Sequence, residues 1–353
     1  MKVVVVGAGI AGLVAAWELS RHSGIDVTVL EAERRPGGVI VTEQVDGFIV
    51  EGGPDGFLAG EPELPELAHE LGIGDHVVSQ RVRGTAVWTG KALEPIEEGR
   101  AAQLLGIEAS SAEVKAGFRS FANGMGEPVA ALAQRLAGTL CFGQEVAAPV
   151  RQGSRWHVAI TGGSTHDADG IVLALPACAV GRLLESVGVA DARVLAEVVY
   201  APSITVSLAY RAEQIGNRLD GAGFVVDATN AAMHLRACTY ASHKFPGRAP
   251  DGHVLLRAYF AAGDGNPENA AHVQLAQILQ IRGEPLWSRV FHWNRGLPRY
   301  GARHAEQVAN LRHGLSRLPR LAIAGAGYDG AGVSACVRSG REAACLIVRA
   351  MAR

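Results

Sequence analysis

Several features that would point to other classes of protein are scarce or absent in this chain. Its 353 residues contain five cysteines, an odd number with no Cys-x-x-Cys pair, so we expect buried free thiols rather than disulfides or a zinc site. The 12 histidines show no His-Glu-x-x-His spacing, and we expect no metal centre. No Ser–His–Asp set and no carboxylate pair stands at a spacing that indicates nucleophilic or glycosidic chemistry.

Excess charge and long apolar runs are missing as well. The formal net charge of −2 provides no basic field, which argues against a nucleic-acid partner. No uninterrupted apolar stretch reaches the ~20 residues that span a bilayer, so we expect no integral membrane association. A strand pattern starts almost at the first residue and leaves no room for a cleavable signal, so we expect a cytoplasmic protein.

Glycine, by contrast, is abundant, with 44 residues, and the most informative glycines follow the first strand. Val3–Val6 is typical of a buried parallel strand, Gly7–Gly12 follows it, and a helical pattern continues from there. This strand–turn–helix order is the context that a dinucleotide-binding fingerprint requires. Gly7 permits the tight turn, Gly9 lets the backbone approach a pyrophosphate, and Gly12 lets the helix pack close to the strand.

A second strand ends at an acidic residue. Asp26–Leu30 is strand-like and leads into Glu31, about 20 positions past the last glycine of the fingerprint, where a carboxylate suits a ribose 2′-hydroxyl. A 2′-phosphate would be repelled by Glu31, which argues against NADP. A Rossmann-like scaffold without a ligand is the alternative interpretation.

The residues around Glu31 carry the first family resemblance. The string VLEAERRPGG (29–38) resembles the FAD signature of the amine oxidase and protoporphyrinogen oxidase superfamily. The resemblance implies that Arg35 and the paired glycines continue the phosphate cradle. It also implies FAD as the cofactor, bound non-covalently, since no cysteine or histidine lies in a recognisable flavin-linking motif. The FAD contacts predicted in this part of the chain are Gly7, Gly9, Ile10, Ala11, Gly12, Glu31, Ala32, Arg35, Gly37 and Gly38.

Longer segments further along narrow the resemblance to the soluble bacterial protoporphyrinogen/coproporphyrinogen III oxidases. They cover most of the chain apart from the stretch around residues 97–120, and they separate this family from the amine oxidases better than the N-terminal fingerprint does. The segments are VDGFIVEGGPDGFLA (45–59), VWTGKALEPI (87–96), ACTYASHKFPGRAPDGHVLLRAYF (237–260), HWNRGLPRYGARH (292–304) and AGAGYDGAGVSACVRSGREAA (324–344).

These segments imply further contacts with the flavin, and each has a plainer interpretation. Gly53–Gly56 could be an ordinary Pro-Asp-Gly turn, Val146 a buried strand valine that also meets the adenine through its backbone, and Trp293 a core aromatic. The helix expected near Val333 would direct its partially positive N-terminus at the flavin pyrimidine. The contacts implied in this way are Gly53, Pro54, Asp55, Gly56, Val146, Trp293, Ala326, Gly327, Gly330, Ala331, Gly332 and Val333.

The resemblance also implies residues that contact the substrate. Some members have a hairpin arginine that pairs with a porphyrinogen propionate, and the corresponding position here is Gly84, with Arg83 beside it. Arg83 is therefore a candidate for a substrate carboxylate, with a solvated surface arginine as the alternative. Tyr300 is the second candidate substrate residue.

The implied fold is α/β: a Rossmann-type FAD-binding domain with a mixed or antiparallel-sheet substrate domain, as in flavin amine oxidases. We expect a discontinuous FAD-binding domain built from residues 1–95, 121–180 and 318–353, and a substrate domain over 181–317. Family members are typically longer, because a helical domain covers the substrate and, in membrane-associated members, contacts lipid. Residues 96–120 would be the remnant of that domain.

The function implied by the resemblance is oxidation of a porphyrinogen, protoporphyrinogen IX or coproporphyrinogen III, to the porphyrin in haem biosynthesis. Hydride would pass to FAD and oxygen would be reduced to peroxide, so no side chain is expected to act as a catalyst. The expected partners are a tetrapyrrole and oxygen, and a homodimer is left open. The alternatives are another FAD-dependent oxidase of the amine oxidase group and a flavin-binding relic without turnover.

Overall fold

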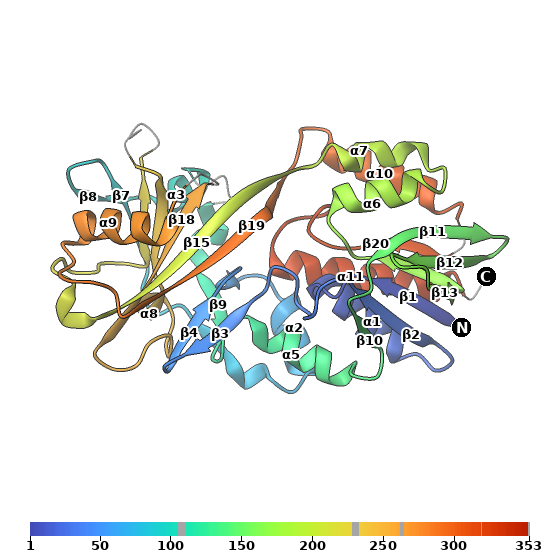
Figure 1. The fold of residues 1–353 in the computed structure, drawn as a ribbon, viewed down its shortest axis with the longest axis horizontal. Coiled ribbons are helices and arrows are strands. Elements are labelled where there is room, and N and C mark those ends of the chain that lie inside the picture. The colour runs from blue at the N-terminus through green and yellow to red at the C-terminus, as the bar shows by residue number, and fades with distance from the viewer. Residues whose placement is uncertain (105–110, 228–232, 262–264, 319, 352–353) are drawn as a thin grey trace.

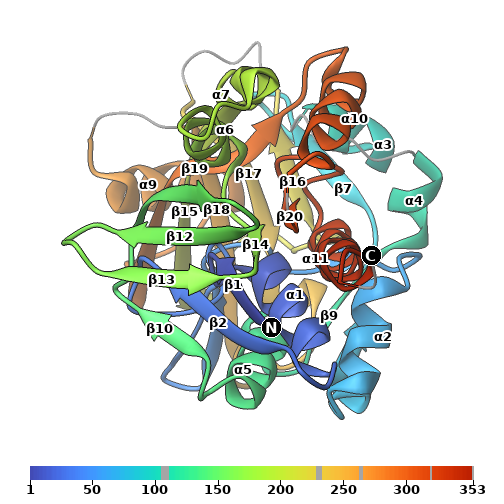
Figure 2. The same ribbon diagram turned by 90° about the vertical axis from the view of Figure 1, so that its right-hand side faces the viewer.

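The computed structural model describes residues 1–104, 111–227, 233–261, 265–318 and 320–351. They form two lobes side by side along the long axis of the molecule, and both termini lie in the first lobe (Figures 1 and 2). In this described part of the chain, no helix has the length and apolar character needed to cross a membrane.

The first lobe is built on a five-stranded parallel sheet whose strands come from the beginning, middle and end of the chain. The valine run folds as β1 because both of its faces are buried: Val3 and Val5 pack into one core, and Val4 and Val6 into another. In spatial order the strands are β10 (Leu140–Phe142), β2 (Asp26–Glu31), β1 (Lys2–Val6), β14 (Gly170–Leu173) and β20 (Leu321–Ile323).

Each face of this sheet is covered by a different layer (Figure 2). Helices cover the face of Val3 and Val5: α1 (Ile10–Ser20), α2 (Glu63–Glu70), α5 (Gly126–Arg135) and α11 (Val333–Arg349). The other face packs against a three-stranded antiparallel sheet and three helices. These are β11 (Val146–Gln152), β12 (Arg155–Ile160), β13 (Thr165–Ala168), α6 (Ala177–Glu185), α7 (Arg193–Ala196) and α10 (His304–Leu315).

The second lobe is a seven-stranded mixed sheet with α9 (Pro267–Leu279) packed on one face. Asn266 caps α9, because its side chain accepts hydrogen bonds from the backbone N–H groups of Glu268 and Asn269. All strand pairs are antiparallel except β16 with β7. The spatial order is β19 (Trp287–Arg299), β15 (Val199–Arg211), β18 (His253–Ala261), β17 (Leu235–Tyr240), β16 (Gly223–Val226), β7 (Thr85–Trp88) and β8 (Leu93–Ile96).

The remaining elements are short. They are β3 (Thr42–Val45), β4 (Phe48–Glu51), β5 (Phe57–Leu58), β6 (Val77–Ser79), β9 (Phe118–Phe121), α3 (Glu98–Leu104), α4 (Ser111–Ala116) and α8 (Ala241–Lys244), with 3-10 turns at Gly74–His76, Ala190–Ala192 and Ala212–Gln214. Helices α3 and α4 occupy the stretch where the sequence predicts a remnant helical domain, and Ala101 of α3 packs on the second sheet against Val225 and Ala237.

The two-lobe α/β fold class is confirmed, but the lobes divide the chain at other places than the expected boundaries. The sequence assigns residues 85–95 to the FAD-binding domain, yet β7 and β8 belong to the seven-stranded sheet because β7 pairs with β16 and β8 with β7. Helices α6, α7 and α10 fall partly or wholly within 181–317 but pack on the first lobe, where they cover apolar strand residues. The order of segments along the sequence does not show that the chain crosses back from one lobe to the other.

The cysteines are free thiols. Cys238 and Cys336 are buried, and burial raises the pKa of the Cys336 thiol to about 12. Cys141 and Cys178 are half-buried. The expectation of burial is wrong for Cys345, which lies on the solvent side of α11.

Candidate functional site

Three glycines shape the turn between β1 and α1 in different ways. Gly7 has φ of +100°, and a Cβ there would lie 2.4 Å from the carbonyl oxygen of Ala174. A Cβ on Gly12 would lie 2.0 Å from the carbonyl oxygen of Gly7, so its absence lets α1 pack on the turn beside Ile10 and Ala11. A Cβ on Gly9 would meet no atom within 4 Å. Gly7 and Gly12 thus serve the fold, whereas Gly9 keeps open a space that no described residue fills.

A second glycine turn lies against the first. The amide of Gly37 donates to the carbonyl of Ala8 at 2.7 Å, and Gly37 forms an isolated parallel bridge with Gly9. A Cβ on Gly38 would lie 3.5 Å from the Cα of Gly9. The guanidinium of Arg35 donates to the carbonyl of Gly38 at 2.8 Å, so it ties this turn together.

The carboxylate of Glu31 closes the same loop. One oxygen accepts from the amide of Ala8 at 2.6 Å and the other from the amide of Glu33 at 2.9 Å. Ala32, between Glu31 and Glu33, is exposed. The predicted contacts of this region, residues 7–12 and 31–38, therefore form one contiguous group at the carboxyl ends of β1 and β2.

Two helix N-termini meet this edge of the sheet. Gly9 is the N-cap of α1 and Gly332 that of α11, and neither helix has a side-chain cap. The first amides of both helices are therefore available to an anionic or carbonyl-bearing ligand. The helices pack closely, since a Cβ on Gly340 of α11 would lie 2.4 Å from the carbonyl oxygen of Ala11.

The turn after β4 is held by the second lobe. The carbonyl oxygen of Gly52 accepts hydrogen bonds from the Thr205 hydroxyl at 3.1 Å, the Arg257 guanidinium at 3.0 Å and the Trp293 indole at 2.8 Å. A Cβ on Gly53 would lie 1.7 Å from the carbonyl oxygen of Val39, and one on Gly56 2.6 Å from that of Arg119. The turn 53–56, with Pro54 at its centre, is thus more tightly enclosed than an ordinary surface turn.

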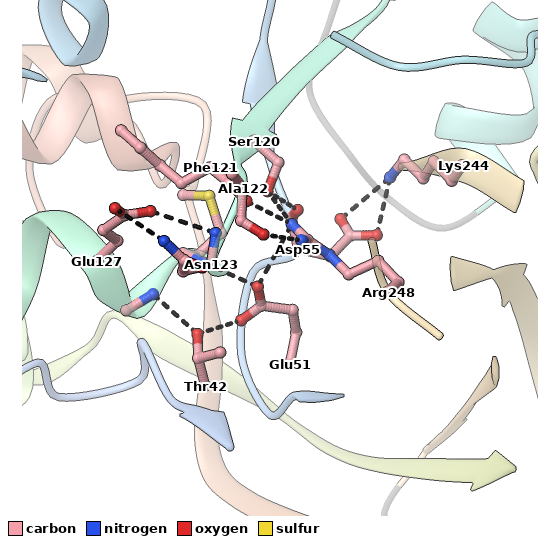
Figure 3. Close-up of polar contacts among 12 residues, drawn as sticks. Thr42, Glu51, Asp55, Ser120, Phe121, Ala122, Asn123, Glu127, Lys244 and Arg248 are labelled. Atoms are coloured by element: carbon pink, nitrogen blue, oxygen red, sulfur yellow. Dashed lines mark hydrogen bonds and ion pairs between the residues drawn. The ribbon is translucent and has the colours of Figure 1, made fainter. Parts of the chain in front are cut away.

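Buried charges surround this turn (Figure 3). Lys244 donates to both carboxylate oxygens of Asp55, at 3.0 and 2.9 Å. Burial alone would raise the pKa of the Asp55 carboxyl, but the Lys244 ammonium and, to a smaller extent, Arg257 outweigh it and hold the pKa below its usual value. Asp55 is therefore an anion with a structural partner.

The pKa of a second buried carboxyl near this turn, that of Glu51, is shifted in the opposite direction. It accepts from the Thr42 hydroxyl at 2.6 Å and from the Met125 amide at 2.7 Å, and it lies 3.9 Å from the Arg248 guanidinium (Figure 3). Burial nevertheless raises the pKa of Glu51 above its usual value. Arg248 is itself buried and donates to the Ser120 hydroxyl at 2.8 Å.

The segment 326–332, directly before α11, is held by side chains at and after the end of β19. The Tyr300 hydroxyl donates to the carbonyl of Ala326, and the His304 ring lies 3.1 Å from the carbonyl of Tyr328. Gly327 packs against Tyr200, whose hydroxyl oxygen would lie 2.9 Å from a Cβ there. The remaining predicted contacts follow directly: Gly330 with φ of +134°, Ala331, the N-cap Gly332, and Val333 as the first residue of α11.

The other three predicted residues, Val146, Arg83 and Tyr300, each have a different partner in the protein. Val146 begins β11 and pairs with Ile160. The Arg83 guanidinium donates to the carbonyls of Lys115 and Ala116 at the end of α4, where helix carbonyls lack partners. Tyr300 is bound to the backbone of Ala326. Their roles toward FAD and substrate stay predictions.

Sequence reasoning missed Thr205, Arg257 and Lys244, although Arg257 and Lys244 stand within a segment that carries the resemblance. Each binds the 52–55 turn across more than 150 residues of sequence. The signal that could have found Arg257 and Lys244 is a cation within an apolar strand–turn segment, because buried cations need partners.

Comparison with known proteins agrees with this geometry. The profile of the family described as flavin containing amine oxidoreductase matches residues 10–121 and 97–348. The chain is 23% identical to the coproporphyrinogen III oxidase of Bacillus subtilis (strain 168) over an alignment of 457 residues that covers 97% of this chain and 96% of the relative. It is 25% identical to that of Mycobacterium bovis over 445 residues, covering 98% and 97%. Both alignments are longer than this chain, so part of each relative has no counterpart here.

Solved structures show the same fold. A protein from Exiguobacterium sp. 255-15, provisionally named a protoporphyrinogen oxidase, has a TM-score of 0.85 at 22% identity, covering 100% of this chain and 99% of that one. Cyclohexylamine oxidase from Brevibacterium oxydans IH-35A has a TM-score of 0.78 at 15% identity, covering 100% and 99%.

Proposed function

This chain belongs to the family of flavin-containing amine oxidoreductases, and we propose that it is an FAD-dependent oxidase that converts a porphyrinogen to the porphyrin. The observation that carries this proposal is the similarity to coproporphyrinogen III oxidases over nearly the whole chain, both lobes included. Coproporphyrinogen III is therefore the substrate we favour over protoporphyrinogen IX. Oxygen as the acceptor, a homodimer and a cytoplasmic location stay predictions.

The residues present fit FAD. The open space at Gly9, next to the uncapped amides of α1, is where a pyrophosphate would be held. Glu31, at the end of β2, is placed to accept a ribose hydroxyl, and Gly37 and Gly38 leave the adjoining turn without side chains. The uncapped start of α11 and the segment 326–332 would face the isoalloxazine.

Bound FAD would supply the redox chemistry, by accepting a hydride from the substrate and passing electrons to oxygen. The protein would hold the ring, orient it and set the local charge. The amides at the start of α11 favour negative charge on a ligand. The turn 52–56 and the segment 326–332 would form two walls of the site, and the second sheet would bound the substrate space.

The decisive experiment is turnover by purified, FAD-loaded protein. Coproporphyrinogen III and protoporphyrinogen IX would each be supplied in air, and porphyrin formation followed by fluorescence. Because porphyrinogens oxidise spontaneously, a variant that lacks FAD, Gly9→Val, is the matched control. We expect porphyrin formation above this control. No turnover of either substrate with FAD fully bound would overturn the proposal.

Amines would be tested in the same assay, since the fold is shared with cyclohexylamine oxidase. Turnover of an amine without turnover of a porphyrinogen would move the assignment to the amine oxidase group. Absence of both reactions would identify a flavin-binding relic.

A further inference from the structure

The two longest strands of the second sheet link both walls of the proposed flavin site. Strands β15 and β19 pair antiparallel from Val199 opposite Arg299 to Ala209 opposite Trp287, and this two-stranded ribbon runs from one lobe to the other (Figure 1). We call β15 and β19 together the ribbon. Both segments that would face the flavin, 52–56 and 326–332, are attached to it.

The first attachment is at Gly52. Its carbonyl oxygen accepts from Thr205 of β15 at 3.1 Å and from Trp293 of β19 at 2.8 Å, and the Arg257 guanidinium of β18 adds a third donor. Gly52 also lies flat on the ribbon, because a Cβ there would be 2.6 Å from the Phe291 ring. The peptide that joins Gly52 to Gly53 is thus fixed with its carbonyl toward the ribbon.

The second attachment is at Ala326 and Gly327. Tyr300, directly after β19, donates from its hydroxyl to the carbonyl of Ala326, and its ring stacks on His304 with centroids 4.5 Å apart. Tyr200 of β15 packs its hydroxyl against Gly327 and accepts from the Ala177 amide at 2.8 Å. The peptide that joins Ala326 to Gly327 also has its carbonyl directed at the ribbon end.

The orientation of these carbonyls fixes the orientation of two amides. In a planar trans peptide the C=O and N–H bonds point in opposite directions. The amides of Gly53 and Gly327 therefore point away from the residues that bind the Gly52 and Ala326 carbonyls. Across the described residues, neither amide donates a hydrogen bond to the protein.

We propose that the ribbon is the positioning element of the flavin site, and that Trp293 and Tyr300 are positioning residues that hold the Gly52 and Ala326 carbonyls so that the Gly53 and Gly327 amides donate to the oxygens and nitrogens of the isoalloxazine. This rests on the proposed binding of FAD, but not on the identity of the substrate. Trp293 and Tyr300 then act through the backbone rather than by touching flavin or substrate themselves. Hydrogen-bond donors aimed at the ring favour its negatively charged reduced form.

The test uses single substitutions with a matched control on the same strand. Trp293→Phe removes the donor to Gly52, and Tyr300→Phe removes the donor to Ala326. Trp287→Phe is the control, because the Trp287 indole N–H is buried and has no hydrogen-bond partner within the described part of the chain. The readouts are the dissociation constant for FAD, the midpoint potential of the bound flavin, and the thermal unfolding temperature.

We expect Trp293→Phe and Tyr300→Phe each to weaken FAD binding by about fivefold, the effect of one neutral hydrogen bond. Each should also lower the midpoint potential, whereas Trp287→Phe changes neither. Thr205→Val combined with Trp293→Phe should have a larger effect, since Gly52 then keeps only Arg257. Trp293→His, which retains a ring N–H, should recover part of the loss.

Equal FAD affinity and equal midpoint potential in Trp293→Phe, Tyr300→Phe and Trp287→Phe would overturn this inference. So would a fall in unfolding temperature with no change in potential, because a purely structural role would produce that result. Wild-type protein that binds no FAD would instead refute the proposed function. The two failures are therefore distinguishable.

Discussion

Both carboxylate oxygens of Asp55 accept hydrogen bonds from the Nζ of Lys244, at 3.0 and 2.9 Å, where the two lobes meet. The two side chains are only 18% and 11% exposed, and the Lys244 ammonium also lies 4.7 Å from the centre of the Phe118 ring. Water screens such a pair weakly. The pair fixes the turn that would face the flavin.

Removing one partner should therefore be costly. Lys244→Met leaves the Asp55 carboxylate buried without its cation, and we expect a loss of about 3–5 kcal/mol in the free energy of unfolding. Asp55→Asn combined with Lys244→Met should lose less, because no unpaired charge remains. Urea unfolding of wild type, single and double variants measures this. A double variant less stable than Lys244→Met would contradict the charge argument.

The same pair sets an acid limit on stability. The folded pKa of Asp55 lies below its usual 3.8, so the stabilisation is complete above that pH and is lost as the pH falls through the lower, folded value. Asp55→Asn should remove this part of the acid dependence. The measurement is urea unfolding between pH 5 and about 2.5, a window chosen to bracket the usual carboxyl pKa. An unchanged acid profile in the variant would refute it.

Glu51 should make the free energy of unfolding change with pH in the opposite direction, and in a higher pH range. Its folded pKa is raised above the usual 4.5, so the folded state keeps a proton that the unfolded chain loses. Stability therefore declines as the pH rises from that value to the folded pKa. Glu51→Gln carries no charge and should lack the decline, whatever its absolute stability. Urea unfolding of wild type and Glu51→Gln from pH 4.5 upward provides the comparison. The same decline of stability with pH in both proteins would contradict this prediction.

The open position at Gly9 allows a clean test of cofactor binding. Gly9→Val places a Cβ where no described atom lies within 4 Å, so the fold should persist while FAD binding is abolished. Gly138→Val is the control, since that exposed glycine also meets no atom within 4 Å and lies away from the predicted contacts. Absorbance after FAD addition and gel filtration gives the answer. A yellow Gly9→Val protein would contradict the assignment of this loop to FAD binding.

Turnover should be slower than in the longer relatives. Part of the Bacillus subtilis relative has no counterpart in this chain, and a less enclosed substrate loses orientation. We expect a rate lower by ~100-fold for coproporphyrinogen III, with FAD affinity little affected. Side-by-side steady-state assays measure the ratio. Equal rates would mean that the extra segment is dispensable.

The sequence predicts those parts of the molecule that depend on neighbours along the chain. The valine strand, the glycine turn, the strand that leads into Glu31 and the helix start at Val333 follow from local pattern, and the structure has each of them at the predicted place. Pairings between distant segments leave no such pattern. The parallel pairing of β7 with β16, which places residues 85–95 in the second lobe instead of the first, is of this kind.

The candidate site divides in the same way. Gly7, Gly9 and Gly12 could be interpreted from spacing, because all three belong to the same local turn between β1 and α1. The partners of Trp293 and Asp55 could not, since Gly52 and Lys244 reach them only after the lobes have come together. Side-chain direction on a strand that crosses between lobes depends on the final packing rather than on local preference.

The parallel sheet of the first lobe also sets the order in which the chain can fold. Strands β1 and β2 are made first, but their sheet gains β20 only at Leu321–Ile323, and α1 is covered by α11 only after that. The seven-stranded sheet has its last strand by Arg299. During synthesis from the N-terminus, the second lobe can therefore be completed before the lobe that was started first. A ribosome-bound chain whose β19 has just left the exit tunnel would hold a finished second sheet beside a first lobe that still lacks its closing strand and helix.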